Sequence, residues 1–191
     1  MSFYTEADLH TFGFKQLGKN IRLSTNASIY NPSNISLGDN CRIDDFVVLS
    51  AGAGGIEIGK NVHIAVFSSL IGAGKITLSD FANISSRVSI YSSNDDYSGE
   101  SMTNPTIPDC FKNVEHNDVS VGKHVIIGSG SVVLPGITLE VGVAIGALSL
   151  VNVSCEEWFV YTGTPIRKIK ERKRTLLELE RQYLESVNVD I

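Results

Sequence analysis

Aliphatic residues recur at every sixth position along most of the chain. A period of six is neither the period of 2 of an ordinary strand nor the 3.6 of an amphipathic helix. It predicts a solenoid of short strands in which three hexads make one coil. Six such coils are expected, at about 18 residues each, and all eighteen of their inward positions are aliphatic: Leu17, Leu23, Ile29; Leu37, Ile43, Leu49; Ile58, Ile64, Leu70; Leu78, Ile84, Ile90; Val121, Ile127, Val133; Leu139, Ile145, Val151.

Two breaks in this pattern define the expected organisation. Residues 96–120 hold no hexad and are rich in turn formers, and loops of such length in a compact domain are usually functional or disordered. Both ends of the chain are predicted to be helical. Residues 5–12 have Thr5 as N-cap, and the charged segment from Arg167 onward has an apolar stripe. We therefore expect an N-terminal cap (1–16), a solenoid (17–156) carrying the inserted loop, and a C-terminal strand and helix cap (157–191).

The repeat resembles that of the hexapeptide-repeat acyltransferases, which fold as left-handed parallel β-helices. The run IGSGSVVLPGITL (127–139) looks like the late-coil signature of this family, and Gly163-Thr-Pro165 is similar to its closing motif. The resemblance implies an all-β solenoid with a C-terminal α-helix, assembled as a homotrimer. It also implies that acetyl-CoA or another acyl-CoA lies in a groove between subunits, with the inserted loop as one wall.

The run before the inserted loop departs from most of this family. Most of its O-acetyltransferases carry a catalytic histidine there, after a glycine, whereas this chain has Asn94 and Asp95. The usual histidine base is therefore missing.

A narrower resemblance addresses this departure. Several runs are similar to a subgroup that acylates the amino group of nucleotide-linked amino-deoxy sugars, a subgroup that includes the anthrose-pathway N-acyltransferases acting on dTDP-4-amino-4,6-dideoxyglucose. These runs are SIYNP (28–32), RIDDF (42–46), DFANISSR (80–87), DDYSG (95–99), PTIP (105–108) and KHVIIG (123–128). The resemblance implies N-acylation for surface polysaccharide or O-antigen synthesis.

The chemistry of an amine substrate suits a carboxylate in place of the histidine. An amine is mostly protonated at neutral pH, and a carboxylate can orient the ammonium and accept its proton during attack on the thioester. The resemblance makes Asp95 the candidate for this role, with Asn94 beside it. Ser85, in the DFANISSR run, is the candidate for a hydrogen bond to the substrate.

Stacking of the coils predicts which polar residues share a face. Lys75 is expected one coil below Asp95, where it would lower the pKa of the carboxylate or hold a phosphate. Arg42, His63 and Asn83 are expected in one column, which either binds a sugar or diphosphate or is a solvated polar face. Tyr91 completes the candidate substrate contacts.

Cofactor contacts are expected along the late coils. Pantetheine amides can pair with backbone near Ser129, Gly146 and Ala147, where the absent side chain of glycine permits close approach. Arg167 and Lys170 are the candidates for the phosphates of coenzyme A.

Composition narrows the alternatives. A net charge of −5 with 42% hydrophobic residues argues against disorder and against nucleic-acid binding by bulk charge. Three cysteines without a CxxC pair favour a reducing, cytoplasmic setting, and no metal-ligand spacing is visible. Residues 125–155 carry one charge, Glu140, but frequent Gly, Ser and Asn argue against a membrane span. Two rival functions stay open: a sugar O-acetyltransferase of the galactoside acetyltransferase type, and a non-catalytic solenoid scaffold.

Overall fold

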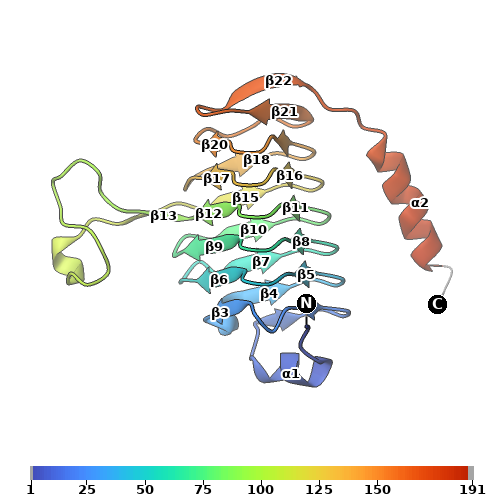
Figure 1. The fold of residues 1–191 in the computed structure, drawn as a ribbon, viewed down its shortest axis with the longest axis horizontal. Helices are drawn as coiled ribbons and strands as arrows, with labels where there is room; N and C mark the ends of the chain where they lie inside the picture. The colour runs from blue at the N-terminus through green and yellow to red at the C-terminus, as the bar shows by residue number, and fades with distance from the viewer. Residues whose placement is uncertain (1, 189–191) are drawn as a thin grey trace.

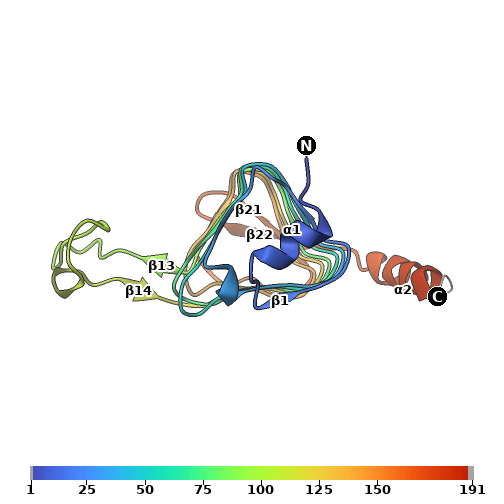
Figure 2. The ribbon, with the colours of Figure 1, turned by 90° about the horizontal axis from the view of Figure 1, so that it is seen from below.

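The computed structural model describes residues 2–188 and shows a left-handed parallel β-helix of triangular cross-section (Figures 1 and 2). Three parallel sheets form its faces. The first sheet holds β1 (Gln16–Leu17), β4 (Ile35–Leu37), β7 (Ile56–Ile58), β10 (Ile76–Leu78), β15 (Val119–Val121) and β18 (Thr138–Leu139). The second holds β2 (Arg22–Leu23), β5 (Arg42–Ile43), β8 (His63–Ile64), β11 (Asn83–Ile84), β16 (Ile126–Ile127), β19 (Ala144–Ile145), β21 (Phe159–Thr162) and β22 (Arg167–Glu171). The third holds β3 (Ser28–Tyr30), β6 (Val48–Ala51), β9 (Ser69–Gly72), β12 (Ser89–Tyr91), β17 (Val132–Val133) and β20 (Leu150–Val151).

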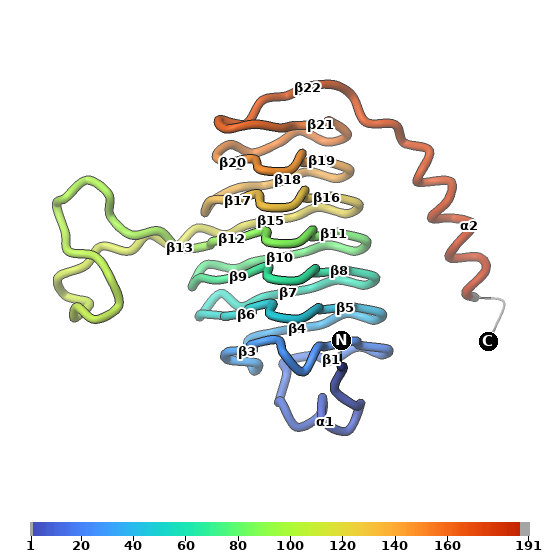
Figure 3. The backbone as a smooth tube through the Cα atoms, in the orientation of Figure 1, coloured from blue at the N-terminus to red at the C-terminus, as the bar shows by residue number. Residues whose placement is uncertain are grey.

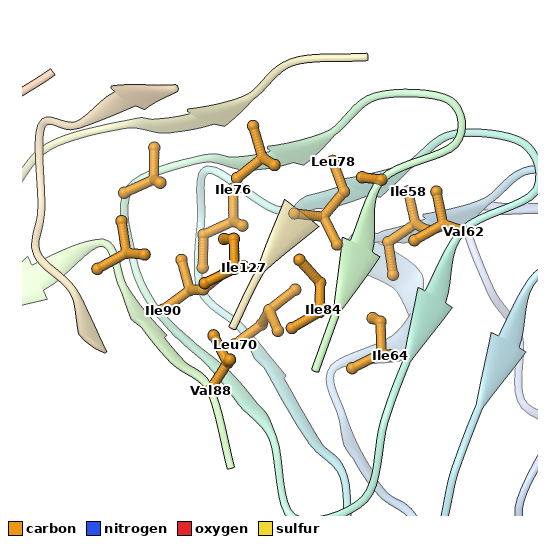
Figure 4. Close-up of a cluster of buried hydrophobic side chains, with 14 of the residues drawn as sticks. Ile58, Val62, Ile64, Leu70, Ile76, Leu78, Ile84, Val88, Ile90 and Ile127 are labelled. Carbon is orange, nitrogen blue, oxygen red and sulfur yellow. The ribbon is translucent and has the colours of Figure 1, made fainter. Parts of the chain in front are cut away.

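The coils stack directly upon one another, as the backbone trace shows (Figure 3). Six coils are complete and β21 opens a seventh, which confirms the predicted fold of about six coils. The hexad residues form the core: Ile84, for example, pairs with Ile64 below and Ile127 above, and all three are fully buried (Figure 4). Of the eighteen predicted inward positions, only Leu17 and Ile29 of the lowest coil are half-buried rather than buried. The six-residue period works because each strand contributes one inward aliphatic side chain per face.

The three corners of the prism differ in chemistry. Between the first and second sheets, which we call the helix corner, asparagines at 20, 40 and 61 take the left-handed conformation that asparagine tolerates. Between the second and third sheets, which we call the aromatic corner, Phe46 and Phe67 take it with φ of 60° and 62°. This conformation costs an ordinary L-residue about 1–2 kcal/mol. The corner between the third and first sheets, the loop corner, carries the insertion.

The segment after Arg167 corrects one prediction. It was expected to be helical, but Arg167–Glu171 form β22, which pairs antiparallel with β21. The reason is that β21 would otherwise leave an open edge on the second sheet, and an added strand pairs it. Arg172 then donates to the carbonyls of His124 (2.7 Å) and Gly142 (3.0 Å), where the chain turns back.

Two helices lie at the ends. Helix α1 (Glu6–Thr11) has Thr5 as N-cap in a capping box with Asp8, as predicted. Helix α2 (Leu176–Asn188) runs back down beside the helix corner (Figure 1). Residues 189–191 of the predicted C-terminal cap lie outside the described residues. None of the helices within residues 2–188 is long and apolar enough to cross a membrane.

Helix α2 is fastened to the helix corner by Glu180. Its carboxylate accepts hydrogen bonds from Lys123 (2.5 Å) and His124 (2.8 Å), and its side chain is 11% exposed. The imidazole of His124 stacks on Phe81, and Tyr183 contacts Phe81 edge-on. The helix is therefore held within its own chain by both charge and aromatic packing.

The inserted loop leaves the prism at the loop corner (Figure 2). Its base is a two-stranded antiparallel ribbon of β13 (Ser93–Asn94) and β14 (Glu115–His116). Interactions with the side chains of Ser98 and Ser101, and with their backbone N–H groups, lower the pKa of Asp96 to about 2. Short 3-10 helices at Pro32–Asn34 and Asp109–Phe111 complete the described elements.

Candidate active site

Asn94 and Asp95 lie at the base of the inserted loop. Asn94 pairs across the ribbon with Glu115, and Asp95 follows it with an exposed side chain. The ribbon brings His116 opposite Ser93, where His116 Nδ1 and Ser93 Oγ are 2.8 Å apart. The ribbon thus places His116 beside Ser93, two residues before Asp95, at the point where the chain leaves the coil. The sequence does not single out His116, because the hexads carry no signal for the antiparallel pairing that places it there.

Ser85 lies at a different corner from Asp95. It follows β11 at the aromatic corner, where its N–H donates to the Ile127 carbonyl and its carbonyl accepts from Ser68 Oγ. Strand β12 with Tyr91, whose side chain is partly exposed, separates it from the loop corner. A single chain therefore does not bring Ser85 and Asp95 together.

The predicted stacking of Lys75 beneath Asp95 is wrong. The chain leaves the coil after Ser92, so the residue above Lys75 is Asp118, whose carboxylate accepts from the Lys75 N–H at 2.8 Å. The Lys75 ammonium pairs instead with Glu57 at 2.8 Å. The hexad count assumed that the coil continued to residue 95, whereas the chain leaves the coil after Ser92.

The column of Arg42, His63 and Asn83 is confirmed as a geometric feature. The three residues pair in register on β5, β8 and β11. Between the first two lies Asp44, a nearly buried carboxylate, which accepts from Arg42 Nε at 2.7 Å and lies 2.9 Å from His63 Nε2. Burial tends to raise the pKa of Asp44, but the hydrogen bonds from His63 and Arg42 outweigh this and lower it.

The residues predicted to contact the cofactor lie on the upper coils. Ser129, Gly146 and Ala147 follow β16 and β19 at the aromatic corner, on the coils above Ser85. The Gly146 N–H donates to the Tyr161 carbonyl, and its own carbonyl accepts from two serine hydroxyls, so these groups already have partners within the coils. A Cβ at this glycine would lie 2.5 Å from Thr162 Oγ1, so packing of the next coil requires glycine.

Arg167 and Lys170, the predicted phosphate contacts, lie on β22 at the upper edge of the second sheet. Arg167 pairs with Thr162 and Lys170 with Val160. Both side chains are exposed. The two residues therefore face outward from the strand that closes the solenoid.

Two hollows lie between helix α2 and the second sheet. One, of about 370 Å³, is bordered by Phe81, Asn83 and Leu179. The other, of about 610 Å³, is bordered by Arg22 and Arg42. Tyr183 borders both, so the helix forms a common wall along the polar column. Within residues 2–188, no cluster of three His, Cys, Asp or Glu side chains is arranged to hold a metal.

The fold is that of the left-handed β-helix acyltransferases, and comparison with known proteins identifies the family. No family model matches the chain. It is 54% identical over 180 residues to an Escherichia coli dTDP-4-amino-4,6-dideoxy-D-glucose acyltransferase, covering 94% of both chains. The crystal structure of AntD, an N-acyltransferase from Bacillus cereus in complex with dTDP and 3-hydroxybutyryl-CoA, superposes with a TM-score of 0.93 at 47% identity, covering 98% of each chain. The chain therefore belongs to the acyltransferase family of these two enzymes.

Structures of AntD variants are equally similar. One, in which a serine is replaced by cysteine, contains dTDP-4-amino-4,6-dideoxyglucose and coenzyme A, with a TM-score of 0.92 at 46% identity. Another carries alanine in place of an aspartate.

Proposed function

We propose that the protein is an acyl-CoA-dependent N-acyltransferase that acylates the amino group of a nucleotide-linked amino-deoxy sugar, dTDP-4-amino-4,6-dideoxyglucose or a close analogue. The observation that carries this proposal is the 54% identity to the E. coli sugar acyltransferase over 94% of both chains. The binding of dTDP and an acyl-CoA by AntD supports it. The acylated sugar then serves surface polysaccharide or O-antigen assembly.

Asp95 is the proposed catalytic group. Its exposed position at the base of the loop gives a substrate ammonium access to the carboxylate, which orients the amine and accepts its proton as nitrogen attacks the thioester carbon. The thiolate of coenzyme A leaves and needs little acid assistance. Asn94 is proposed to hold the sugar beside Asp95, and Ser85 to donate a hydrogen bond to it.

A homotrimer is proposed because Ser85 and Asp95 lie at different corners of one chain. Both can serve one site when the loop corner of one subunit meets the aromatic corner of the next. The aromatic corner supports this arrangement: Phe46 and Phe67 stack with ring centroids 5.0 Å apart, yet are 52% and 53% exposed. Large aromatic side chains held on the surface in a costly backbone conformation indicate a contact surface.

The other candidate contacts and the cellular location complete the proposal. Tyr91, Lys75 and the Arg42–His63–Asn83 column are proposed to contact the nucleotide sugar, and Ser129, Gly146, Ala147, Arg167 and Lys170 the acyl-CoA. A cytoplasmic location is proposed, which the three cysteines support because all of them are free thiols.

The decisive experiment measures release of free thiol from acetyl-CoA in the presence of dTDP-4-amino-4,6-dideoxyglucose. We expect saturable turnover and a product mass increased by one acetyl group. Acetylation of a free sugar hydroxyl without turnover of any nucleotide amino sugar would instead establish the O-acetyltransferase alternative. A protein that gives no thermal shift with coenzyme A would be a scaffold.

A further inference from the structure

Asp44 lies in an unusual position for a charged residue on a β-helix. Its side chain is only 7% exposed, between two outward-facing groups on neighbouring coils. Arg42 Nε donates to Oδ1, and His63 Nε2 contacts Oδ2. Because an ionised carboxylate only accepts hydrogen bonds, Nε2 carries its hydrogen, and Nδ1 lies on the side of the ring away from Asp44. One buried carboxylate thus sets the orientation of a guanidinium and an imidazole.

The groups that Asp44 orients belong to a longer line. Arg22, Arg42, His63 and Asn83 pair in register on β2, β5, β8 and β11, so neighbours lie about 4.8 Å apart. The side chains of Arg42 and His63 are 44% and 40% exposed, and Arg22 is exposed. Hydrogen-bonding nitrogens spaced by one coil can span the oxygens of two linked phosphate groups.

Helix α2 borders this line through two hollows that share Tyr183, and His63 lies between them in register. The hollow beside Arg22 and Arg42 is also bordered by Asn20 and Asn40. The hollow beside Asn83 is bordered by Phe81 and Leu179, together with Arg172 and the ion pair of His124 and Glu180. The groove therefore has two arginines at its lower end and an aromatic ring with aliphatic side chains, beside these ionised groups, at its upper end. A nucleoside diphosphate has the matching polarity, with charged phosphates at one end and a flat base at the other.

We infer that Asp44 is a positioning residue that aligns Arg42 and His63 to bind the phosphates of a nucleoside diphosphate in the groove between helix α2 and the second sheet. The inference rests on the proposed function, whose two substrates each contain a nucleoside diphosphate. The shared chemistry has two sources, the dTDP of the sugar that accepts the acyl group and the ADP portion of coenzyme A. Asp45 offers a matched control, because this adjacent carboxylate accepts from Ser24 Oγ on the coil below.

The test is titration calorimetry of the full-length protein with dTDP and, separately, with coenzyme A. Asp44→Asn should weaken the binding of one of these ligands by about tenfold or more, because a charged partner is lost from two aligned groups. Asp45→Asn should stay within about twofold of wild type. In the acyl-transfer assay, Asp44→Asn should raise KM for the substrate that carries that nucleotide and leave kcat unchanged. Loss of dTDP affinity assigns the groove to the nucleotide sugar, and loss of coenzyme A affinity assigns it to the acyl donor.

Unchanged affinity of Asp44→Asn for both ligands would overturn the inference. If that variant does not fold, the exposed substitutions Arg22→Gln and His63→Gln decide, and wild-type affinity in both would overturn it equally. Asp44-dependent binding of dTDP in a protein that transfers no acyl group would support the inference while the proposed function failed. Acyl transfer with the same KM values in wild type and Asp44→Asn would support the proposed function and overturn the inference.

Discussion

The inserted loop and helix α2 both project from the prism, yet they are stabilised in different ways. Helix α2 is fastened to the coil by Glu180, Phe81 and Tyr183. The loop is joined to the coil by a two-residue ribbon, and Tyr97, Met102 and Phe111 remain 88%, 53% and 58% exposed. Helix α2 also exposes apolar side chains, with Leu179 at 59% and Val187 at 45%, so both projections present apolar surface. The difference is that α2 is anchored within its own chain by an ion pair, whereas the loop is held only by its ribbon.

Substitution of Phe67 by aspartate should have the largest effect, because it acts on the surface proposed to receive the loop of a second subunit. A charge on the aromatic corner opposes burial against another copy. The proposed trimer should therefore dissociate and activity fall about 100-fold or more, because the proposed shared site of Ser85 and Asp95 is lost. Light scattering on a sizing column reports the assembly, and circular dichroism should show the coil intact. Leu177→Asp, at an exposed position on helix α2 and away from both the aromatic and the loop corners, is the control. A fully active monomer would contradict the shared site.

Asp95→Asn should cost about 10²–10⁴-fold in kcat, because the amide cannot accept the proton of the substrate ammonium. Steady-state kinetics at saturating concentrations of both substrates measure the effect. Asp109→Asn, on the exposed tip of the same loop, should retain wild-type kcat. Equal rates for the two variants would remove Asp95 from the mechanism.

Truncation of a core side chain should lower the free energy of unfolding much more than truncation of a loop side chain. Ile84→Ala removes a fully buried side chain and should lower the free energy of unfolding by about 2–5 kcal/mol. Glu100→Ala, at an exposed polar position in the loop, should change it by no more than about 0.5 kcal/mol. Urea unfolding at one fixed protein concentration compares the two, so that any contribution of subunit association is the same for both. A larger loss from Glu100→Ala would show that the loop is part of the folding core.

Glu180→Gln should have the smallest effect of the four main substitutions. It should lower the free energy that holds helix α2 against the coil by about 1 kcal/mol. Hydrogen exchange of residues 176–188 should accelerate while the coils stay protected. Burial tends to raise the pKa of Glu180, but Lys123 and His124 outweigh it and hold the pKa below its ordinary value of 4.5. The stabilisation is therefore complete above pH 4.5 and declines as the pH falls through the lowered pKa of the folded state. A protection factor of these amides, corrected for the intrinsic pH dependence of exchange, that does not change between pH 6 and pH 3 would contradict this ion pair.

The sequence predicted well those features that repeat. Each coil rests on the coil below, so residues one hexad period apart share one environment, and the column of Arg42, His63 and Asn83 follows directly. Prediction failed where the repeat stopped. The column from Lys75 to Asp95 assumed a coil that the chain had already left, and the helical reading of Arg167 ignored the open edge of β21.

The sequence by itself determined the solenoid, because one aliphatic side chain per hexad can be buried in only one way when the strands stack in parallel. It also identified Asp95 and Ser85 as candidates through their motifs. Only the tertiary structure placed these two at different corners, set Asp44 between Arg42 and His63, and laid helix α2 beside that column. Those relations depend on contacts between segments far apart in the chain, and no local period encodes such contacts.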